Sequence, residues 1–305
     1  ANLTLLNQGA RTAMEYKTIT FEMVANPRRP EEKTIGVLTL NQPDRLNAIT
    51  PLMRLELDTI FNVLRYHPDM RVLIITGAGR GFSSGGDLKT EATTLGVPVT
   101  DEEPTGLSGP YKEMMEYWFN DVRHFYIQRL MRRLEDLPQI TIAAINGWAA
   151  GAGMEMIAMC DIRISSDQAK IAEVAVAAGF FPESGGTRTL PKLIGKGRAL
   201  ELILTGRPVL ADEALRIGLV DRVVPHAKLM EQTLDLAGEI ACKPYLSILR
   251  SKELVKMYWT AEASDERWAK ELQSVNDIVR TKDCQEGIRA FIEKRPPNYR
   301  GPRVP

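Results

Sequence analysis

Two hydrophobic periods alternate along the first part of the chain. Apolar and polar side chains alternate over Thr18–Val24 and Thr34–Leu40, and this period of two predicts half-buried strands. Thr50 and Pro51 then provide an N-cap and a first-turn proline, after which apolar residues recur at helical spacing. The short apolar run Arg71–Thr76 ends at glycines and predicts a buried strand.

The same order of elements is repeated further along the chain. The pattern predicts an amphipathic helix around Tyr111–Leu137, a strand over Ile140–Ile145, a glycine turn and another helix. Strands that alternate with helices predict an α/β fold with parallel pairing. Between Thr90 and Pro110 the chain is rich in Thr, Gly, Pro, Asp and Glu, which predicts a long surface loop, and such loops are often functional lids.

The strand signals end after about Val224. Residues from Ala227 to Phe291 have the pattern of successive helices, interrupted near Lys243-Pro244. We therefore expect two parts, an α/β core over residues 1–225 and a helical C-terminal domain over residues 226–305.

Composition and charge narrow the range of partners. The 305 residues carry 39 basic and 39 acidic side chains, so the formal net charge of zero gives no support for a nucleic-acid or anionic-membrane partner. The most apolar stretch, near Ile142–Met159, is interrupted by glycines and by Glu155, so we expect no membrane span. The N-terminus lacks a secretory pattern, and we expect a cytoplasmic protein, or a protein of an organellar matrix if a presequence has been removed.

The three cysteines and three histidines are widely separated, without CxxC or HExxH spacing. A reducing compartment is therefore the simpler interpretation, and we expect no metal site.

Two glycine-rich turns carry the candidate chemistry. The glycines of Gly77–Asp87 do not match GxGxxG, and no GK[ST] is present, which argues against dinucleotide and P-loop sites. The second turn, Asn146–Glu155, lies between a predicted strand and a predicted helix, where free backbone N–H groups favour negative charge. For each turn, a purely structural role is the alternative.

Together the two turns resemble the oxyanion segments of the crotonase (enoyl-CoA hydratase/isomerase) superfamily. Phe82–Lys89 looks like the first segment, and Asn146–Glu155, followed by Met159–Arg163, looks like the second. Other segments agree in order along roughly 16–301: Pro43–Ala48, Ser184–Pro191, Leu204–Gly206, Ala214–Val220 and Gln285–Pro296. Residues from about Thr90 to Tyr111 look like an insertion relative to shorter members.

The resemblance implies a crotonase-type β/α spiral core with a helical C-terminal domain that packs between subunits of a homotrimer or homohexamer. It also implies that the backbone N–H groups of Gly86 and Ala152 bind the thioester oxygen of an acyl-CoA as enolate charge develops. Such donors are commonly worth about 3–4 kcal/mol each. Coenzyme A is then part of the substrate, and no cofactor is bound permanently.

The acid and base residues depart from the family's two-glutamate hydratase pattern. Glu155 matches the first glutamate, but Ala175 stands at the position of the second. Glu173 precedes Ala175 by two residues, and we expect for it a solvated or structural role. Glu183 falls where the dienoyl-CoA isomerase branch carries an acidic catalytic residue, so Glu155 and Glu183 are the expected catalytic pair; a helix cap is the alternative role for Glu183.

A further set of residues is expected at the substrate. Arg45, Lys89 and Lys294 are candidates for the phosphates of coenzyme A, by the resemblance and because phosphate requires cations. Ser84 and Asp87 belong to the first oxyanion segment, and Trp148 is a candidate for the pocket wall, with ordinary packing as its alternative.

The sequence therefore predicts an enzyme that hydrates or isomerises an enoyl- or dienoyl-CoA through a stabilised enolate. The alternative is a crotonase-fold hydrolase that cleaves a thioester or a C–C bond, because such relatives keep the oxyanion hole and change the acid/base residues, as this chain does. A binding protein without activity is disfavoured by the neutral charge and by Glu155.

Overall fold

The computed structural model describes residues 16–87, 125–178 and 181–260, together with a few positions between 282 and 298. The predicted loop Thr90–Pro110 and the first part of the predicted helix Tyr111–Leu137 lie outside these residues. Within the described part, no helix is long and apolar enough to cross a membrane.

The main sheet of the described residues has six strands. In sheet order they are β1 (Ile19–Val24), β2 (Ile35–Leu40), β3 (Val72–Gly77), β5 (Ile140–Ile145), β7 (Ile162–Ser166) and β10 (Arg222–Val224). All neighbours pair in parallel except β1 and β2, which are antiparallel because only a short connection joins them. The four strands predicted from alternation or apolar runs are thus confirmed to within one residue at their ends.

A second, smaller sheet of four short strands escaped the sequence analysis. Its order is β4 (Gly81–Ser83), β6 (Trp148–Ala150), β8 (Lys170–Ala172) and β9 (Val209–Leu210). Strands β4, β6 and β8 pair in parallel and follow β3, β5 and β7 respectively, so that each turn of the chain supplies one strand to each sheet. This repeat is the predicted β/α spiral.

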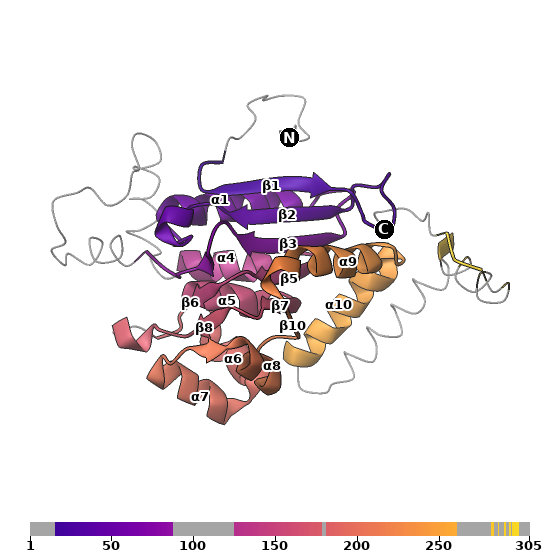
Figure 1. Cartoon of the computed structure of the whole chain (residues 1–305). Coiled ribbons are helices and arrows are strands. Elements are labelled where there is room, and N and C mark those ends of the chain that lie inside the picture. Colours follow the sequence, from indigo (N-terminus) through magenta and orange to yellow (C-terminus); the bar gives the residue numbers. More distant parts are fainter. Residues whose placement is uncertain are drawn as a thin grey trace.

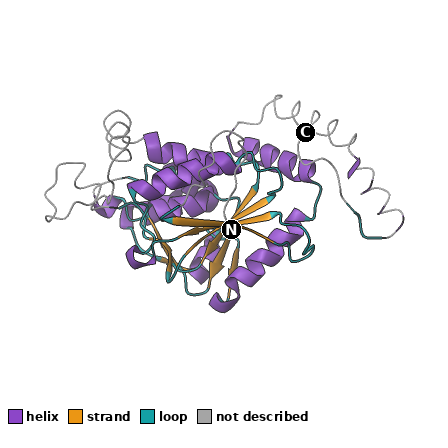
Figure 2. Cartoon of the chain, turned by 90° about the horizontal axis from the view of Figure 1, so that it is seen from above, coloured by secondary structure: helices purple, strands orange, loops and turns teal. Residues whose placement is uncertain are grey.

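Helices cover both faces of the main sheet (Figures 1 and 2). Alternate side chains of β2 explain this arrangement: Leu38 and Leu40 belong to the core that contains α1, α4 and α5, whereas Ile35 and Val37 belong to a second core beneath α9. The helices of the described residues are α1 (Pro51–Leu64), α4 (Phe125–Glu135), α5 (Ala152–Met159), α6 (Gly186–Ile194), α7 (Lys196–Thr205), α8 (Ala211–Ile217), α9 (Leu229–Ala241) and α10 (Tyr245–Thr260).

A local sequence signal explains where α1 begins. The Thr50 hydroxyl accepts a hydrogen bond from the Met53 amide at 3.2 Å, and Pro51 is the first residue of α1, as predicted. After β10 the described chain forms α9 and α10, in agreement with the predicted helical region, and α9 packs directly on the main sheet (Figure 1). A domain boundary near residue 225 stays a prediction.

Candidate active site

The two glycine turns meet at one edge of the second sheet. Strands β4 and β6 are parallel neighbours, so the turns that follow them lie side by side. Gly85 has φ +93°, and a Cβ added there would lie 2.6 Å from the Ala150 carbonyl oxygen and 3.3 Å from the Ala152 nitrogen. Only glycine therefore fits at position 85, and the first turn is pressed against the beginning of α5.

Neighbouring hydrogen bonds fix the first turn. The Ile49 amide donates to the Gly85 carbonyl at 2.8 Å, and the Gly85 amide donates to Ser83 Oγ at 3.2 Å. Ser83 Oγ in turn donates to the Asn47 carbonyl at 2.8 Å. These hydrogen bonds fix the backbone just before Gly86, and none of them involves the Gly86 amide.

The second turn is fixed in a similar way. The Gly151 amide donates to the Ala172 carbonyl of β8 at 3.0 Å, which places Ala152 as the first residue of α5. First-turn amides of a helix have no intrahelical acceptor. Within the described part of the chain, neither the Gly86 amide nor the Ala152 amide has a hydrogen-bond partner, and both residues are partly exposed. The two predicted oxyanion donors are therefore close together and available to a ligand.

Glu155 lies in the first turn of α5, beneath these amides. Its side chain is buried, and Oε1 accepts a hydrogen bond from the Gly186 amide at 2.7 Å. Burial, followed by the negative charge of Glu173 and then of Glu183, raises the pKa of Glu155 to about 8, although the hydrogen bond from the Gly186 N–H group opposes the rise. Glu155 can therefore hold and release a proton near neutral pH, as an acid/base residue must.

Glu173 is the first residue after β8 and is also buried. Its Oε1 accepts a hydrogen bond from the Ala175 amide at 3.2 Å. Burial is the main cause that raises the pKa of Glu173 to about 7, with Glu183 as a further contributor, against the effect of the Ala175 N–H group. Of the two roles expected for Glu173, a solvated one is wrong, because Glu173 is buried.

Glu183 lies in the turn before α6 and is half-buried. Its negative charge contributes to the raised pKa values of both Glu155 and Glu173, so the structure brings three carboxyl groups together. The alternative role of Glu183 as a helix cap is not observed, because α6 has Gly185 as its N-cap, without a side-chain hydrogen bond.

Three of the expected substrate-binding residues lie beside Gly86. Arg45 Nη2 lies 3.2 Å from Asp87 Oδ2, and Ser84 Oγ donates to the Arg45 carbonyl at 3.4 Å. Trp148 is half-buried in β6, next to β4. The remaining two expected residues, Lys89 and Lys294, lie outside the described residues.

The sequence analysis did not single out Gly186. A Cβ on this residue would lie 2.8 Å from Glu155 Oε1, so glycine is required for the close contact between its amide and the carboxylate. The pair of glycines at the start of α6 was the available signal, because two adjacent glycines at a helix start indicate a close approach of backbone to another group.

The substitution Gly186→Ala tests this contact. We expect it to displace the Glu155 carboxylate and to lower kcat by about 10- to 100-fold, although no ionisable group is removed. Steady-state kinetics with an enoyl-CoA, the substrate that the resemblance implies, measures the effect. Gly197→Ala is the matched control, because no atom lies within 4 Å of a Cβ at that glycine of α7, and an equal loss in both variants would contradict the interpretation.

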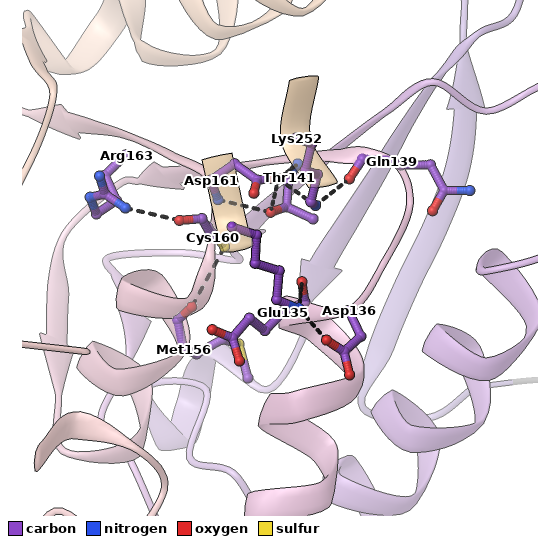
Figure 3. Close-up of polar contacts among 10 residues, drawn as sticks. Glu135, Asp136, Gln139, Thr141, Met156, Cys160, Asp161, Arg163 and Lys252 are labelled. Carbon is purple, nitrogen blue, oxygen red and sulfur yellow. Dashed lines mark hydrogen bonds and ion pairs between the residues drawn. The ribbon is translucent and has the colours of Figure 1, made fainter. Parts of the chain in front are cut away.

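A cavity of about 750 Å³ lies away from the three glutamates, between the end of α5, α6, α9 and α10. Its wall includes a polar network in which Lys252 Nζ contacts Asp161 Oδ2 at 2.6 Å and the Gln139 carbonyl at 2.7 Å (Figure 3). Cys160 is buried beside it, and burial raises the pKa of its thiol to about 12. None of the described residues that line this cavity belongs to the two glycine turns, and the raised pKa keeps the Cys160 thiol protonated.

No cluster of three His, Cys, Asp or Glu side chains in the described ranges has the arrangement of a metal site. The groups that the glycine turns, α5 and the segment after β8 supply are backbone amides and carboxyl groups, which suit the stabilisation of an oxyanion together with proton transfer.

Comparison with known proteins identifies the class to which this site belongs. The family model described as enoyl-CoA hydratase/isomerase matches residues 30–102 and 107–302, so the chain belongs to the enoyl-CoA hydratase/isomerase family. This confirms the resemblance to the crotonase superfamily and its fold.

Named relatives agree with this assignment. The chain is 33% identical over 268 residues to the short-chain-enoyl-CoA hydratase of Clostridium acetobutylicum, which covers 87% of this chain and 94% of that protein. It is 32% identical over 270 residues to the 1,2-epoxyphenylacetyl-CoA isomerase of Escherichia coli, and the match covers 88% of this chain and 96% of that protein. The crystal structure of the enoyl-CoA hydratase from Bacillus anthracis superimposes with a TM-score of 0.78 at 32% identity, covering 93% of this chain and 99% of that one.

Proposed function

We propose that the protein hydrates or isomerises the double bond of an enoyl- or dienoyl-CoA thioester through an enolate. The observation that carries this proposal is the position of the Gly86 and Ala152 amides, available to a ligand and adjacent to the buried carboxyl group of Glu155. Family membership and the hydratase and isomerase names of the relatives support it.

The two amides act on the charge that appears during the reaction. The thioester oxygen accepts hydrogen bonds from Gly86 and Ala152, and these strengthen as the carbonyl becomes an enolate oxygen. Ala152 also stands at the N-terminus of α5, where the partial positive charge of the helix favours an anion. The donors are backbone groups held by neighbouring hydrogen bonds, so little reorganisation is needed when the charge develops.

The carboxyl groups move the protons. In hydration, a carboxylate removes a proton from water, whose hydroxyl group adds to the β-carbon, and a carboxylic acid donates a proton to the α-carbon. In isomerisation, one carbon of the acyl chain loses a proton and another gains one. Glu155 and Glu183 are the proposed catalytic pair, and both reactions leave the total number of protons on the enzyme unchanged.

Coenzyme A is bound as part of the substrate, by the proposed residues Arg45, Lys89 and Lys294, and no permanent cofactor takes part. The Asp87 carboxylate would repel phosphate and therefore does not bind it directly. Its role is to orient the Arg45 guanidinium group through their contact. Ser84 supports the backbone of Arg45, and Trp148 forms part of the pocket wall.

The substitution Arg45→Ala tests the phosphate contact. We expect KM for a CoA thioester to rise roughly 3- to 10-fold with little change in kcat, a modest effect because the Arg45 side chain is 44% exposed. The corresponding acyl-pantetheine thioester, which lacks the nucleotide phosphates, is the control substrate. An equal rise in KM for both substrates would contradict a phosphate contact.

A crotonase-fold hydrolase is the second candidate, favoured by Ala175 at the position of a hydratase glutamate. The products distinguish the two candidates: thioester cleavage releases free CoA thiol, and C–C cleavage shortens the acyl group, whereas hydration and isomerisation leave an intact acyl-CoA. A thiol assay and mass spectrometry of the products of crotonyl-CoA and a conjugated dienoyl-CoA therefore test the proposed function.

We propose that the protein assembles as a homotrimer or homohexamer, which light scattering of the purified protein tests. A cytoplasmic location, or an organellar matrix, stays an expectation; one relative, the enoyl-CoA hydratase of Pongo abelii, is mitochondrial by name.

A further inference from the structure

We propose that Glu155 and Glu173 form a buried carboxyl pair that retains one proton at neutral pH, and that Glu173 thereby controls the protonation state of Glu155. Glu173 is then a positioning residue that acts through Glu155. The inference deepens the proposed function, since it concerns the same site, but its main test requires no substrate.

The pairing of two short strands brings together the segments that carry these two side chains. Ala150 of β6 and Ala172 of β8 are partners in the parallel register, and the Gly151 amide donates to the Ala172 carbonyl at 3.0 Å. Glu173 is the residue after Ala172, and Glu155 lies one helical turn beyond Gly151, to whose carbonyl its amide donates at 2.9 Å. Both glutamates therefore follow the carboxyl ends of neighbouring strands of the second sheet.

The two side chains are almost completely removed from water. Glu155 is 2% exposed and Glu173 is 1% exposed. Within the described residues, no lysine or arginine forms an ion pair with either carboxyl group, and Glu173 Oε2 has no hydrogen-bond partner. Two buried carboxylates without a cation are costly, so retention of a proton is favoured.

Among the residues that the structure describes, groups on the surrounding elements do not reverse this balance. The turn before α6 contributes Glu183, a third carboxyl group, and the Ser184 hydroxyl. Beyond α7, Gly206 approaches the Glu173 backbone, and the neighbouring Arg207 is engaged by Glu201 and Glu213. The pKa values of about 8 for Glu155 and about 7 for Glu173 agree with a pair that gives up its protons in two steps around neutral pH.

In this arrangement Ala175 contributes its backbone amide. It has no carboxyl group, but its amide donates to Glu173 Oε1 at 3.2 Å. Position 175 therefore orients, through its backbone, a glutamate that stands two residues earlier than the hydratase pattern expects.

The experiment is a pH titration of glutamate side-chain carboxyl carbons by ¹³C NMR, on the full-length protein without substrate. In the wild type we expect two coupled transitions above pH 6, one of which is lost in Glu155→Gln. In Glu173→Gln we expect the remaining Glu155 transition to move to lower pH by about one unit, because a neighbouring negative charge has been removed. Glu56→Gln, which replaces a buried glutamate of α1, is the matched control and should leave the transition in place.

Two results would overturn the proposal: wild-type carboxyl groups that all titrate in the ordinary glutamate range, or a Glu155 transition that does not move in folded Glu173→Gln. The wild-type titration decides the question even if Glu173→Gln fails to fold. An enzyme inactive on every CoA thioester, with the two transitions present, would refute the proposed function and leave the carboxyl pair intact.

Discussion

Glu155→Gln is expected to lower kcat on an enoyl-CoA substrate by about 10²- to 10⁴-fold, the usual contribution of a positioned acid or base. The amide oxygen of glutamine can still accept the hydrogen bond from the Gly186 amide, so the side chain should keep its place while the transferable proton is lost. Steady-state kinetics gives kcat, and binding of a non-reactive CoA thioester is expected to change little.

Protein stability provides the control for this variant. The raised pKa of Glu155 means that the folded protein binds a proton more tightly than the unfolded chain, so ionisation of Glu155 removes stability as the pH rises from about 4.5 to about 8. The neutral glutamine lacks this effect, and the variant should unfold at an equal or higher temperature than the wild type at pH 8. A variant that folds and keeps more than a tenth of wild-type kcat would refute the catalytic role of Glu155.

Ala152→Pro should remove one oxyanion donor while preserving the helix. Ala152 is the first residue of α5, where proline is tolerated because its missing N–H group has no intrahelical acceptor. Loss of the donor should lower kcat by about 10²- to 10³-fold. A larger decrease in kcat than increase in KM would show that the lost hydrogen bond is stronger in the transition state.

The first residue of α7 offers a matched control for this change. Lys196 is exposed and, like Ala152, follows a glycine N-cap with positive φ. Lys196→Pro should retain wild-type activity. Equal losses in the two proline variants would assign the effect to the backbone and not to an oxyanion donor.

Four strands of the main sheet could be predicted because each is long enough to show a period. The strands β1, β2, β3 and β5 have six residues each, enough for alternation or an apolar run to be visible. The strands of the second sheet have two or three residues, fewer than a period can define. Strands β4, β6 and β8 extend the turns that follow strands of the main sheet, and β9 follows α7. Their pairing is set by tertiary contacts.

The candidate site also contains residues that the sequence predicted and residues that it did not. Gly86, Ala152 and Glu155 lie in glycine turns whose sequences are distinctive, and the structure brings these three residues together. Burial of Glu173, which directly follows β8, depends on the tertiary packing around it, and the contact of Gly186 with Glu155 depends on how α6 meets α5. Neither follows from local sequence, because both join segments that are distant along the chain.

The central claim is that the protein changes the carbon–carbon double bond of a CoA thioester and leaves the thioester intact. The most direct test incubates the wild type and Glu155→Gln with crotonyl-CoA and a conjugated dienoyl-CoA, and identifies the products by mass spectrometry and a free-thiol assay. We predict a hydrated or isomerised acyl-CoA, without release of CoA thiol, in the wild type only. Release of CoA thiol or a shortened acyl group as the sole product would contradict the claim and identify a hydrolase.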